Sequence, residues 1–373
     1  MGLLNVSKFP VNTLVGADWK TFQAVTKGRY VAPEKHNKFL LTKYFCRLLS
    51  LSSSLQERKY RNQLSNQPLQ HDPLFILGHW RSGTTFVHNI FAQDQRFGYT
   101  TTYQTVFPHH MMAMQWLLKP IMKVFIPKHR PTDNMELSPE LPQEEEFGLM
   151  NTCPVSYYNF WFYPQYMREY CDRFLTMKKA TPEEITDFKE KFMKIIKVSM
   201  WNSRNGVPDA QYLSKNPPHT GKVKTLVEMF PNAKFIFLIR DPYTVFESSC
   251  SFFTQTIAPL ELNSITKEEM EHNILYGYRE MYDAYQEQKK YIPEGHLFEV
   301  KFEEFEKNAL QITERIYQEL DIPGWEQARP AIEAYINRKK EHKKNQYQYN
   351  SRTISMINDA WGDILDTWGY KRL

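Results

Sequence analysis

Residues 74–85 read Leu-Phe-Ile-Leu-Gly-His-Trp-Arg-Ser-Gly-Thr-Thr, and this stretch decides the fold of the 373-residue chain. Its first four residues form an apolar run of a length typical of a buried strand, and Gly78 ends the run. From Thr84 to Ala92 apolar residues recur at helical spacing, which predicts a helix. The stretch therefore predicts a strand, a glycine-containing turn and a helix.

The turn has the composition of a phosphate-binding loop. Gly78 and Gly83 let the backbone curl so that N–H groups and the helix N-terminus face one anion. An ATP-binding loop would place Lys after the second glycine, where it reaches the β- and γ-phosphates. Here Thr84 takes that place and the cation, Arg81, lies three positions earlier. The loop therefore predicts an anion-binding site and disfavours an ordinary nucleotide triphosphatase. The alternative is a strand-to-helix turn that binds no ligand.

Strands and helices alternate along the rest of the chain. Further strands are expected at Gln211–Ser214, Phe235–Ile239 and Leu297–Phe302, and the five-residue apolar run Phe235–Ile239 is short enough for a buried parallel strand. Helices are expected at Lys38–Ser50, Pro182–Asn202, Thr220–Met229, from Tyr243, and at Lys267–Lys290, Gln311–Leu320 and Trp325–Arg338. This order predicts an α/β fold, a P-loop-type parallel sheet flanked by helices on both faces.

The domain organisation expected from this pattern is simple. Residues 1–70 form an N-terminal helical extension, and residues 71–373 form one α/β domain. Within that domain, a helical insertion of about 106–205 is expected to carry the acceptor site.

Two motifs resemble the sulfotransferase family. Residues 80–86 are similar to its 5′-phosphosulfate loop, which in cytosolic members reads Lys-Ser-Gly-Thr-Thr-Trp. Residues 237–242, with Ser248 on the next helix, resemble the family's strand that ends in Arg with a Ser eight residues later. The resemblance covers Leu74 to about Lys301 and implies the sulfotransferase fold and the donor 3′-phosphoadenosine 5′-phosphosulfate (PAPS). It assigns donor binding to Trp80, Arg81, Ser82, Gly83, Thr84, Thr85, Arg240 and Ser248.

Three other segments, 142–147, 215–219 and 298–305, resemble the mostly bacterial branch of that family, and within it enzymes that sulfate sterols. A rival interpretation treats Asp241, at the end of its apolar strand, as the magnesium ligand of a P-loop nucleotide kinase. That interpretation needs the loop Lys which this chain lacks.

Sulfuryl transfer requires cations on the leaving oxygen and a base for the acceptor hydroxyl, but no metal. Arg81 and Lys215 are the expected cations, Lys215 by its resemblance to a family lysine. Pro217 stands where the cytosolic enzymes have their catalytic His, so that base cannot be transferred to this chain. The candidate bases are His219, Glu144 and Glu146, since Glu145 is expected to point elsewhere.

The acceptor is expected to be apolar. Large apolar residues crowd the stretch between Phe86 and Phe174, which favours a pocket for a sterol, a steroid or another lipid alcohol over one for a carbohydrate or glycolipid. With Lys119 and Lys123, the same stretch could also lie on a membrane surface and collect such a substrate. These apolar residues are Phe107, Met111, Met112, Met114, Trp116, Phe125, Met150, Tyr157, Tyr158, Phe160, Trp161, Phe162 and Tyr163.

Composition sets broader limits. With 47 Lys and Arg against 42 Asp and Glu, the net charge of +5 gives little support for nucleic-acid binding and fits a small anionic ligand. One basic cluster, 338–344, could close over the donor's 3′-phosphate, although a solvated helix end fits it better. The four cysteines lack metal-ligand spacing, and the sequence shows no signal-peptide pattern and no long apolar span. These features predict a reduced, cytoplasmic protein. The sequence leaves the oligomeric state open.

Overall fold

The structure, a computed structural model, describes residues 11–65, 69–129, 135–201, 210–339 and 347–373. Its centre is a five-stranded parallel sheet in the order β2-β3-β1-β4-β5. The strands are β1 (Leu74–Leu77), β2 (Phe97–Gly98), β3 (Gln211–Lys215), β4 (Lys234–Ile239) and β5 (Leu297–Lys301). The predicted α/β fold with a parallel sheet is confirmed.

The register of the sheet brings the ends of three strands together. Ile76 pairs with Lys215, and Leu77 pairs with Phe237. The loop that follows β1 therefore lies between Lys215 at the end of β3 and Arg240 just after β4. Open parallel sheets bind ligands at this edge.

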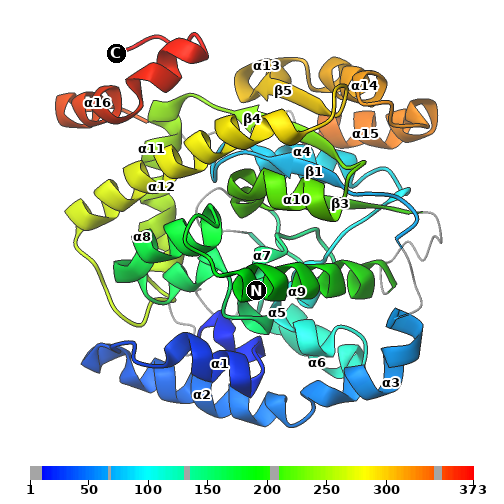
Figure 1. Cartoon of the computed structure of the whole chain (residues 1–373), viewed down its shortest axis with the longest axis vertical. Coiled ribbons are helices and arrows are strands. Elements are labelled where there is room, and N and C mark those ends of the chain that lie inside the picture. The colour runs from blue at the N-terminus through cyan, green and yellow to red at the C-terminus, as the bar shows by residue number, and fades with distance from the viewer. Residues whose placement is uncertain (1–10, 66–68, 130–134, 202–209, 340–346) are drawn as a thin grey trace.

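Helices cover both faces of the sheet (Figure 1). Alternate residues of β1 enter separate cores: Leu74 and Ile76 face one core, and Phe75 and Leu77 face the other. The first core is closed by α4 (Thr84–Phe91), α14 (Ala309–Glu319) and α15 (Trp325–Lys339), next to the short α13 (Phe302–Lys307). The second is closed by α9 (Pro182–Trp201), α10 (Val223–Met229), α11 (Pro242–Phe252), α12 (Lys267–Gln288) and α16 (Ser351–Thr367).

A further helical layer lies at the lower end of Figure 1, away from the sheet. It contains the N-terminal helices α1 (Trp19–Thr26), α2 (His36–Ser50) and α3 (Ser53–Ser65), with α6 (Gln115–Phe125) above them. Between this layer and the sheet lie the short helices α5 (Thr102–Val106), α7 (Glu146–Thr152) and α8 (Met167–Tyr170).

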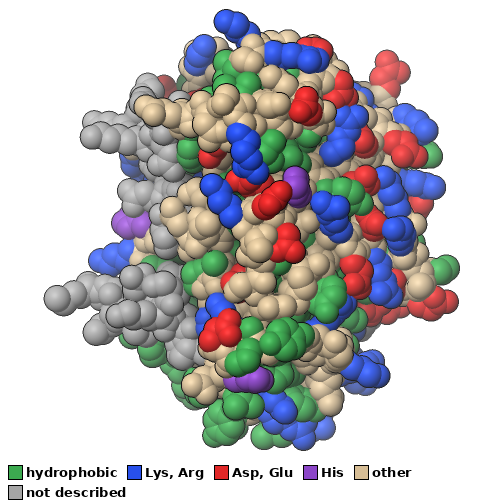
Figure 2. All heavy atoms as spheres, turned by 90° about the vertical axis from the view of Figure 1, so that its left-hand side faces the viewer, with side chains coloured by type: hydrophobic (Ala, Val, Ile, Leu, Met, Phe, Trp, Pro, Cys, Tyr) green, Lys and Arg blue, Asp and Glu red, His purple; other side chains and the backbone are tan. Residues whose placement is uncertain are grey.

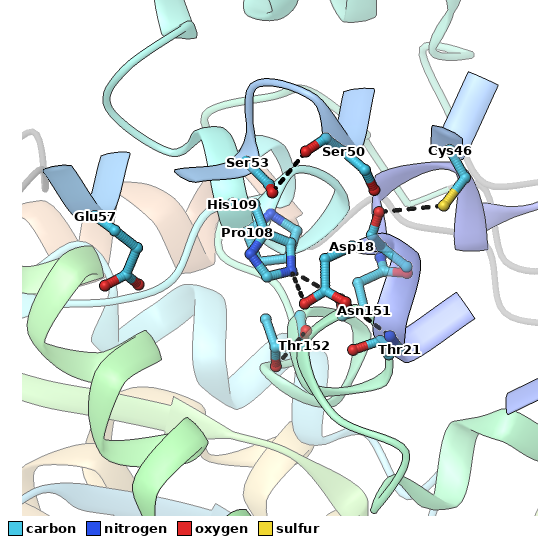
Figure 3. A network of polar contacts seen from close by, with 12 residues as sticks. Asp18, Thr21, Cys46, Ser50, Ser53, Glu57, Pro108, His109, Asn151 and Thr152 are labelled. Atoms are coloured by element: carbon cyan, nitrogen blue, oxygen red, sulfur yellow. Dashed lines mark hydrogen bonds and ion pairs between the residues drawn. The ribbon is translucent and has the colours of Figure 1, made fainter. Parts of the chain in front are cut away.

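Polar contacts fasten the N-terminal layer to α7 (Figure 3). The His109 ring nitrogen Nε2 lies 3.0 Å from the Asn151 carbonyl oxygen and 3.4 Å from an Asp18 carboxylate oxygen. Asp18 also accepts the N–H of Thr21 at 2.7 Å, which caps α1. The lower layer and α7 are therefore held in one arrangement.

The boundaries of the predicted elements agree with the structure within two residues, with one clear exception. The helix expected from Thr220 begins at Val223, because residues 217–222 form a 3-10 turn that starts with two prolines. The two-residue β2 and the helices α1, α3, α5, α6, α7, α8, α13 and α16 were not predicted individually, although α1 and α3 lie in the expected N-terminal helical extension.

Within the described ranges, no helix has the length and apolar character needed to cross a membrane.

Candidate active site

Two glycines shape the loop after β1. Gly78 and Gly83 have φ values of +140° and +87°, which L-residues with side chains rarely adopt. A Cβ atom on Gly78 would lie 2.6 Å from the Leu238 carbonyl oxygen, and one on Gly83 would lie 2.1 Å from the Phe302 ring. The glycines are therefore required both by backbone conformation and by space.

The loop ends at the N-terminus of α4. Gly83 caps this helix without a side-chain acceptor, so the helix provides backbone N–H donors and the positive end of its dipole at the loop. Ser82 and Thr84 are buried, whereas Trp80 and Thr85 are partly exposed. This is an arrangement that suits a phosphate group.

The two motifs predicted to bind the donor converge in the structure. The Arg81 side chain donates from Nε to the Ser248 hydroxyl oxygen at 2.8 Å. Arg240 donates from a terminal guanidinium nitrogen to the Arg81 carbonyl oxygen at 3.0 Å. Arg81 has a left-handed φ of +70°, a conformation that costs about 1–3 kcal/mol in a residue other than glycine. The two hydrogen bonds help to offset this cost.

Asp241 has a structural role next to Arg240. Its carboxylate accepts the N–H of Thr244 at 3.0 Å and caps α11, and its own N–H donates to Glu303 at 3.0 Å. A capping carboxylate accounts for this residue without a metal. Among the residues that the structure describes, no group of three or more His, Cys, Asp and Glu side chains could hold a metal ion.

Glu144 links the end of β3 to the loop. One of its carboxylate oxygens accepts a hydrogen bond from the Lys215 ammonium group, and the other accepts one from the Tyr158 hydroxyl. The Tyr158 oxygen in turn accepts the indole N–H of Trp80 at 2.7 Å. Glu144 retains 8% of its exposure, whereas Glu145 and Glu146 retain none. A carboxylate, an ammonium group and the anion loop thus form one connected site.

Glu146, a candidate base from the sequence, is a fully buried structural residue. Its carboxylate accepts the Ser156 hydroxyl at 2.8 Å, the Tyr157 N–H at 2.9 Å and the Asn216 amide at 3.0 Å. The buried ammonium group of Lys222 lies 3.7 Å away. Because these groups surround both oxygens and the side chain has no exposed surface, unlike that of Glu144, the arrangement disfavours Glu146 as the base.

Glu145 is also buried and, as expected, points elsewhere. It accepts the Tyr212 hydroxyl at 2.8 Å on the opposite face of β3 from Leu213. Burial raises the pKa of Glu145 to about 7, although the hydrogen bond from Tyr212 lowers it.

His219, the other candidate base, lies in the hydrophobic core. Its ring packs against Phe75, Phe188 and Phe192, with centroids 4.7–6.4 Å apart, and it has no exposed surface. Burial lowers the pKa of His219 well below its ordinary value, and the charge of Lys222 adds to this. An acceptor hydroxyl has no access to this ring, so the prediction of His219 as the base is disfavoured.

No polar role was predicted from the sequence for three residues of this region, although Tyr158 was expected among the large apolar residues. Tyr158 bonds Glu144, and Thr220 accepts the N–H of Gly78 at 2.8 Å and fixes the start of the loop. His88, on α4, is buried, and neither ring nitrogen has a hydrogen-bond partner in the described part of the chain. No local pattern distinguishes these residues, because their contacts join segments far apart in the sequence.

Aromatic rings surround the site. Trp80 lies 5.3 Å from Tyr157 between ring centroids, and Trp161 lies 4.9 Å from Phe147 and 5.3 Å from Phe252. The Arg81 guanidinium carbon is 5.9 Å from the Phe252 centroid. Part of the predicted apolar group, 157–163, is therefore buried near the site. Trp116 and Phe125, from the same group, are exposed at the lower end of the molecule.

Of the predicted basic cluster 338–344, Arg338 and Lys339 end α15, and residues 340–344 lie outside the described residues.

The strand ends of this parallel sheet bring together the glycine-containing loop, two arginines, a lysine and a carboxylate. This arrangement is typical of an enzyme that transfers an anionic group. The chain belongs to the Sulfotransferase family, which matches residues 73–327, and it is a sulfotransferase. This family membership removes the kinase alternative.

Similar proteins are known from mycobacteria. The chain is 28% identical over 318 residues to omega-hydroxy-beta-dihydromenaquinone-9 sulfotransferase Stf3 of Mycobacterium bovis, which spans 85% of this chain and 80% of that protein. The crystal structure of sulfotransferase STF9 from Mycobacterium avium matches with a TM-score of 0.71 and 16% identity, covering 95% of this chain and 93% of that one. STF1 from Mycobacterium tuberculosis matches with a TM-score of 0.67 and 13% identity, covering 92% and 90%. These two structures share the fold.

Proposed function

We propose that this sulfotransferase moves the sulfuryl group of PAPS to the hydroxyl group of an apolar acceptor, a sterol, a steroid or another lipid alcohol. The observation that carries the proposal is the contact of Glu144 with Lys215 beside the Arg81 loop, among aromatic side chains. This arrangement supplies a base, two cations and an apolar surround in one place.

The donor is proposed from the contacts between the two motifs. The loop 80–85 and the start of α4 are suited to the 5′-phosphosulfate, because they offer backbone N–H groups and hydroxyls. Arg240 and Ser248 would hold the 3′-phosphate, and the proposal that one ligand reaches both groups is supported by their hydrogen bonds to Arg81.

The proposed base is Glu144. Its carboxylate takes the acceptor's hydroxyl proton as the acceptor oxygen forms a bond to sulfur and the bond between sulfur and the 5′-phosphate oxygen breaks. The new negative charge on the leaving phosphate is stabilised by Lys215 and Arg81. Once Glu144 is protonated, Lys215 has lost its anionic partner, so its charge is available to the leaving oxygen. A general base of this kind contributes about 10²–10⁴-fold to the rate.

The acceptor class is proposed from the aromatic surround. Phe252 lies close to the Arg81 side chain, and Trp161 and then Phe147 continue this aromatic cluster away from it. Apolar surroundings of this kind favour a rigid or extended hydrocarbon over a polyhydroxylated sugar. The name of the M. bovis relative gives its substrate as omega-hydroxy-beta-dihydromenaquinone-9, which also presents a hydroxyl on an apolar body.

Transfer of labelled sulfate from PAPS to a steroid alcohol, a long-chain alcohol and a monosaccharide tests the proposal. We expect product with the apolar alcohols, and a decrease in kcat of about 10²–10⁴-fold in Glu144→Gln with donor binding retained. Glu145→Gln is the matched control, because Glu145 is the adjacent carboxylate and bonds Tyr212 instead; its kcat should stay within about threefold of the wild-type value. Transfer to the sugar alone, or full activity in Glu144→Gln, would contradict the proposal.

A further inference from the structure

Helix α2 carries its apolar residues on the outside. Leu40, Leu41, Tyr44, Phe45 and Leu48 are exposed, and their spacing places them on one face of the helix. The residues of α2 that are buried are Thr42 and Cys46. A helix of a globular protein ordinarily turns its apolar face to the core, so α2 has the reverse orientation.

Helix α6 repeats this reversal. Trp116, Leu117, Ile121, Val124 and Phe125 are exposed at the same helical spacing, and Trp116 keeps 76% of its exposure. Leu118 is its one buried residue. Of the sixteen large hydrophobic side chains exposed in the described residues, eight belong to residues 30–55 and five to α6.

The turn between α2 and α3, with the start of α3, contacts the segment that precedes α6. At the start of α3, the Gln56 side chain donates to the Pro108 carbonyl at 3.2 Å and accepts the Met112 N–H at 2.9 Å. Ser52, between α2 and α3, lies 3.0 Å from a ring nitrogen of His110. The exposed Leu51 at the end of α2 is therefore held near the start of α6. We call the exposed side chains of residues 40–55 and 116–125 the basal face.

The charge on the basal face has one sign. Neither α2 nor α6 contains Asp or Glu, whereas Lys43, Arg47 and Lys123 are exposed among the apolar residues. Figure 2 shows hydrophobic and basic side chains interspersed at the lower end of the molecule. Contiguous apolar surface of this kind is uncommon on monomeric proteins, and cationic side chains favour an anionic partner.

We propose that the basal face docks on the surface of a lipid bilayer that contains anionic lipids. The exposed stripes of α2 and α6 would lie in the interface between headgroups and acyl chains, with the lysines and arginine at the headgroups.

Docking would bring the enzyme to its substrate, a step that rests on the proposed apolar acceptor. Contacts of His109 with Asp18 and Asn151 connect the N-terminal layer that carries α2 to α7 (Figure 3). Helix α7 begins at Glu146, two residues after Glu144. The surface that meets the lipid and the proposed base are therefore parts of one connected scaffold. An acceptor dissolved in the bilayer would reach an enzyme that is held at its surface.

Sedimentation of the full chain with vesicles, in the absence of donor and acceptor, tests docking alone. We expect binding to phosphatidylcholine vesicles that contain phosphatidylglycerol, and weaker binding when NaCl rises from about 0.1 to about 0.5 M. Trp116→Ser and Leu48→Ser should each lower the partition coefficient by about tenfold. Tyr291→Ser, which changes an exposed aromatic residue outside the basal face, should leave it within about twofold.

Activity on a water-soluble alcohol completes the test, because none of these positions lies in the proposed site. Equal turnover of that alcohol by Trp116→Ser and wild type, with lower turnover of a vesicle-bound alcohol, would support docking. Vesicle binding without transfer to any apolar alcohol would contradict the acceptor proposal while it supported docking. No vesicle binding by the wild type, or a dimer that Trp116→Ser dissociates, would overturn docking.

Discussion

The pair formed by Glu146 and Lys222 allows a quantitative test of the structural role given to Glu146. Both side chains are fully buried, and their charged atoms lie 3.7 Å apart. In Glu146→Gln the Lys222 ammonium group stays buried but no longer faces a carboxylate. The centroid of the Phe188 ring lies 4.5 Å from this ammonium group. Removing one partner of a buried pair costs about 3–5 kcal/mol, because the other charge is left uncompensated.

The two residues are also expected to be coupled. Lys222→Met leaves the Glu146 carboxylate with three hydrogen-bond donors, so it should destabilise less than Glu146→Gln. The double variant removes both charges, and we expect it to lose about 1–3 kcal/mol less than the sum of the single variants. Urea unfolding followed by circular dichroism gives the four free energies of unfolding that this cycle needs.

A kinetic result could refute the same reasoning. If Glu146→Gln lowered kcat about a hundredfold while its free energy of unfolding matched the wild type, Glu146 would be acting in the reaction rather than in the core. Additive losses in the cycle, within about 0.5 kcal/mol, would show that the pair does not interact.

Three more outcomes are expected. Gly83→Ala should abolish donor binding, measured by calorimetry, because its Cβ would lie 2.1 Å from the Phe302 ring; normal affinity would contradict the loop geometry. Arg240→Ala should remove the thermal stabilisation that 3′-phosphoadenosine 5′-phosphate gives the wild type, about 2.7 kcal/mol at a hundredfold excess over Kd. Burial raises the pKa of Glu145 from 4.5 to about 7. Between pH 4.5 and about 7 the folded state therefore keeps a proton on Glu145 that the unfolded state has lost. The free energy of unfolding should fall as the pH rises through this range. Glu145→Gln should remove about 3 kcal/mol of this pH-dependent fall in the free energy of unfolding, measured by urea unfolding at several pH values. An unchanged pH dependence would contradict the raised pKa of Glu145.

The fold was predictable because its signals are local. The apolar run of β1, the two glycines and the helix that follows lie within one short stretch, and the strand ending in Arg240 repeats the pattern. Arg81 lies in the same stretch, whereas the role of Lys215, at the end of β3, was implied by its resemblance to a family lysine. Each of these signals depends on neighbours in sequence, which is the information that hydrophobic periodicity and turn residues carry.

The base could not be chosen from the sequence because the choice depends on tertiary contacts. Glu144, Glu145 and Glu146 are adjacent, yet they reach Lys215, Tyr212 and Lys222 respectively. Helical spacing alone favoured Glu144 and Glu146 equally. The reversed α2 was hidden for a related reason: an amphipathic pattern gives the apolar face of a helix but not whether that face meets the core or the solvent.

The fluorescence of Trp80 should report on the state of the site. Its indole N–H donates to Tyr158, whose hydroxyl donates to Glu144, so a change of charge on the carboxylate reaches a chromophore through two hydrogen bonds. Trp80 also lies in the loop between Gly78 and Gly83, where an incoming anion would alter its surroundings. The difference in fluorescence emission between the wild type and Trp80→Phe should therefore follow occupancy of the loop and protonation of Glu144 in real time, without an attached label.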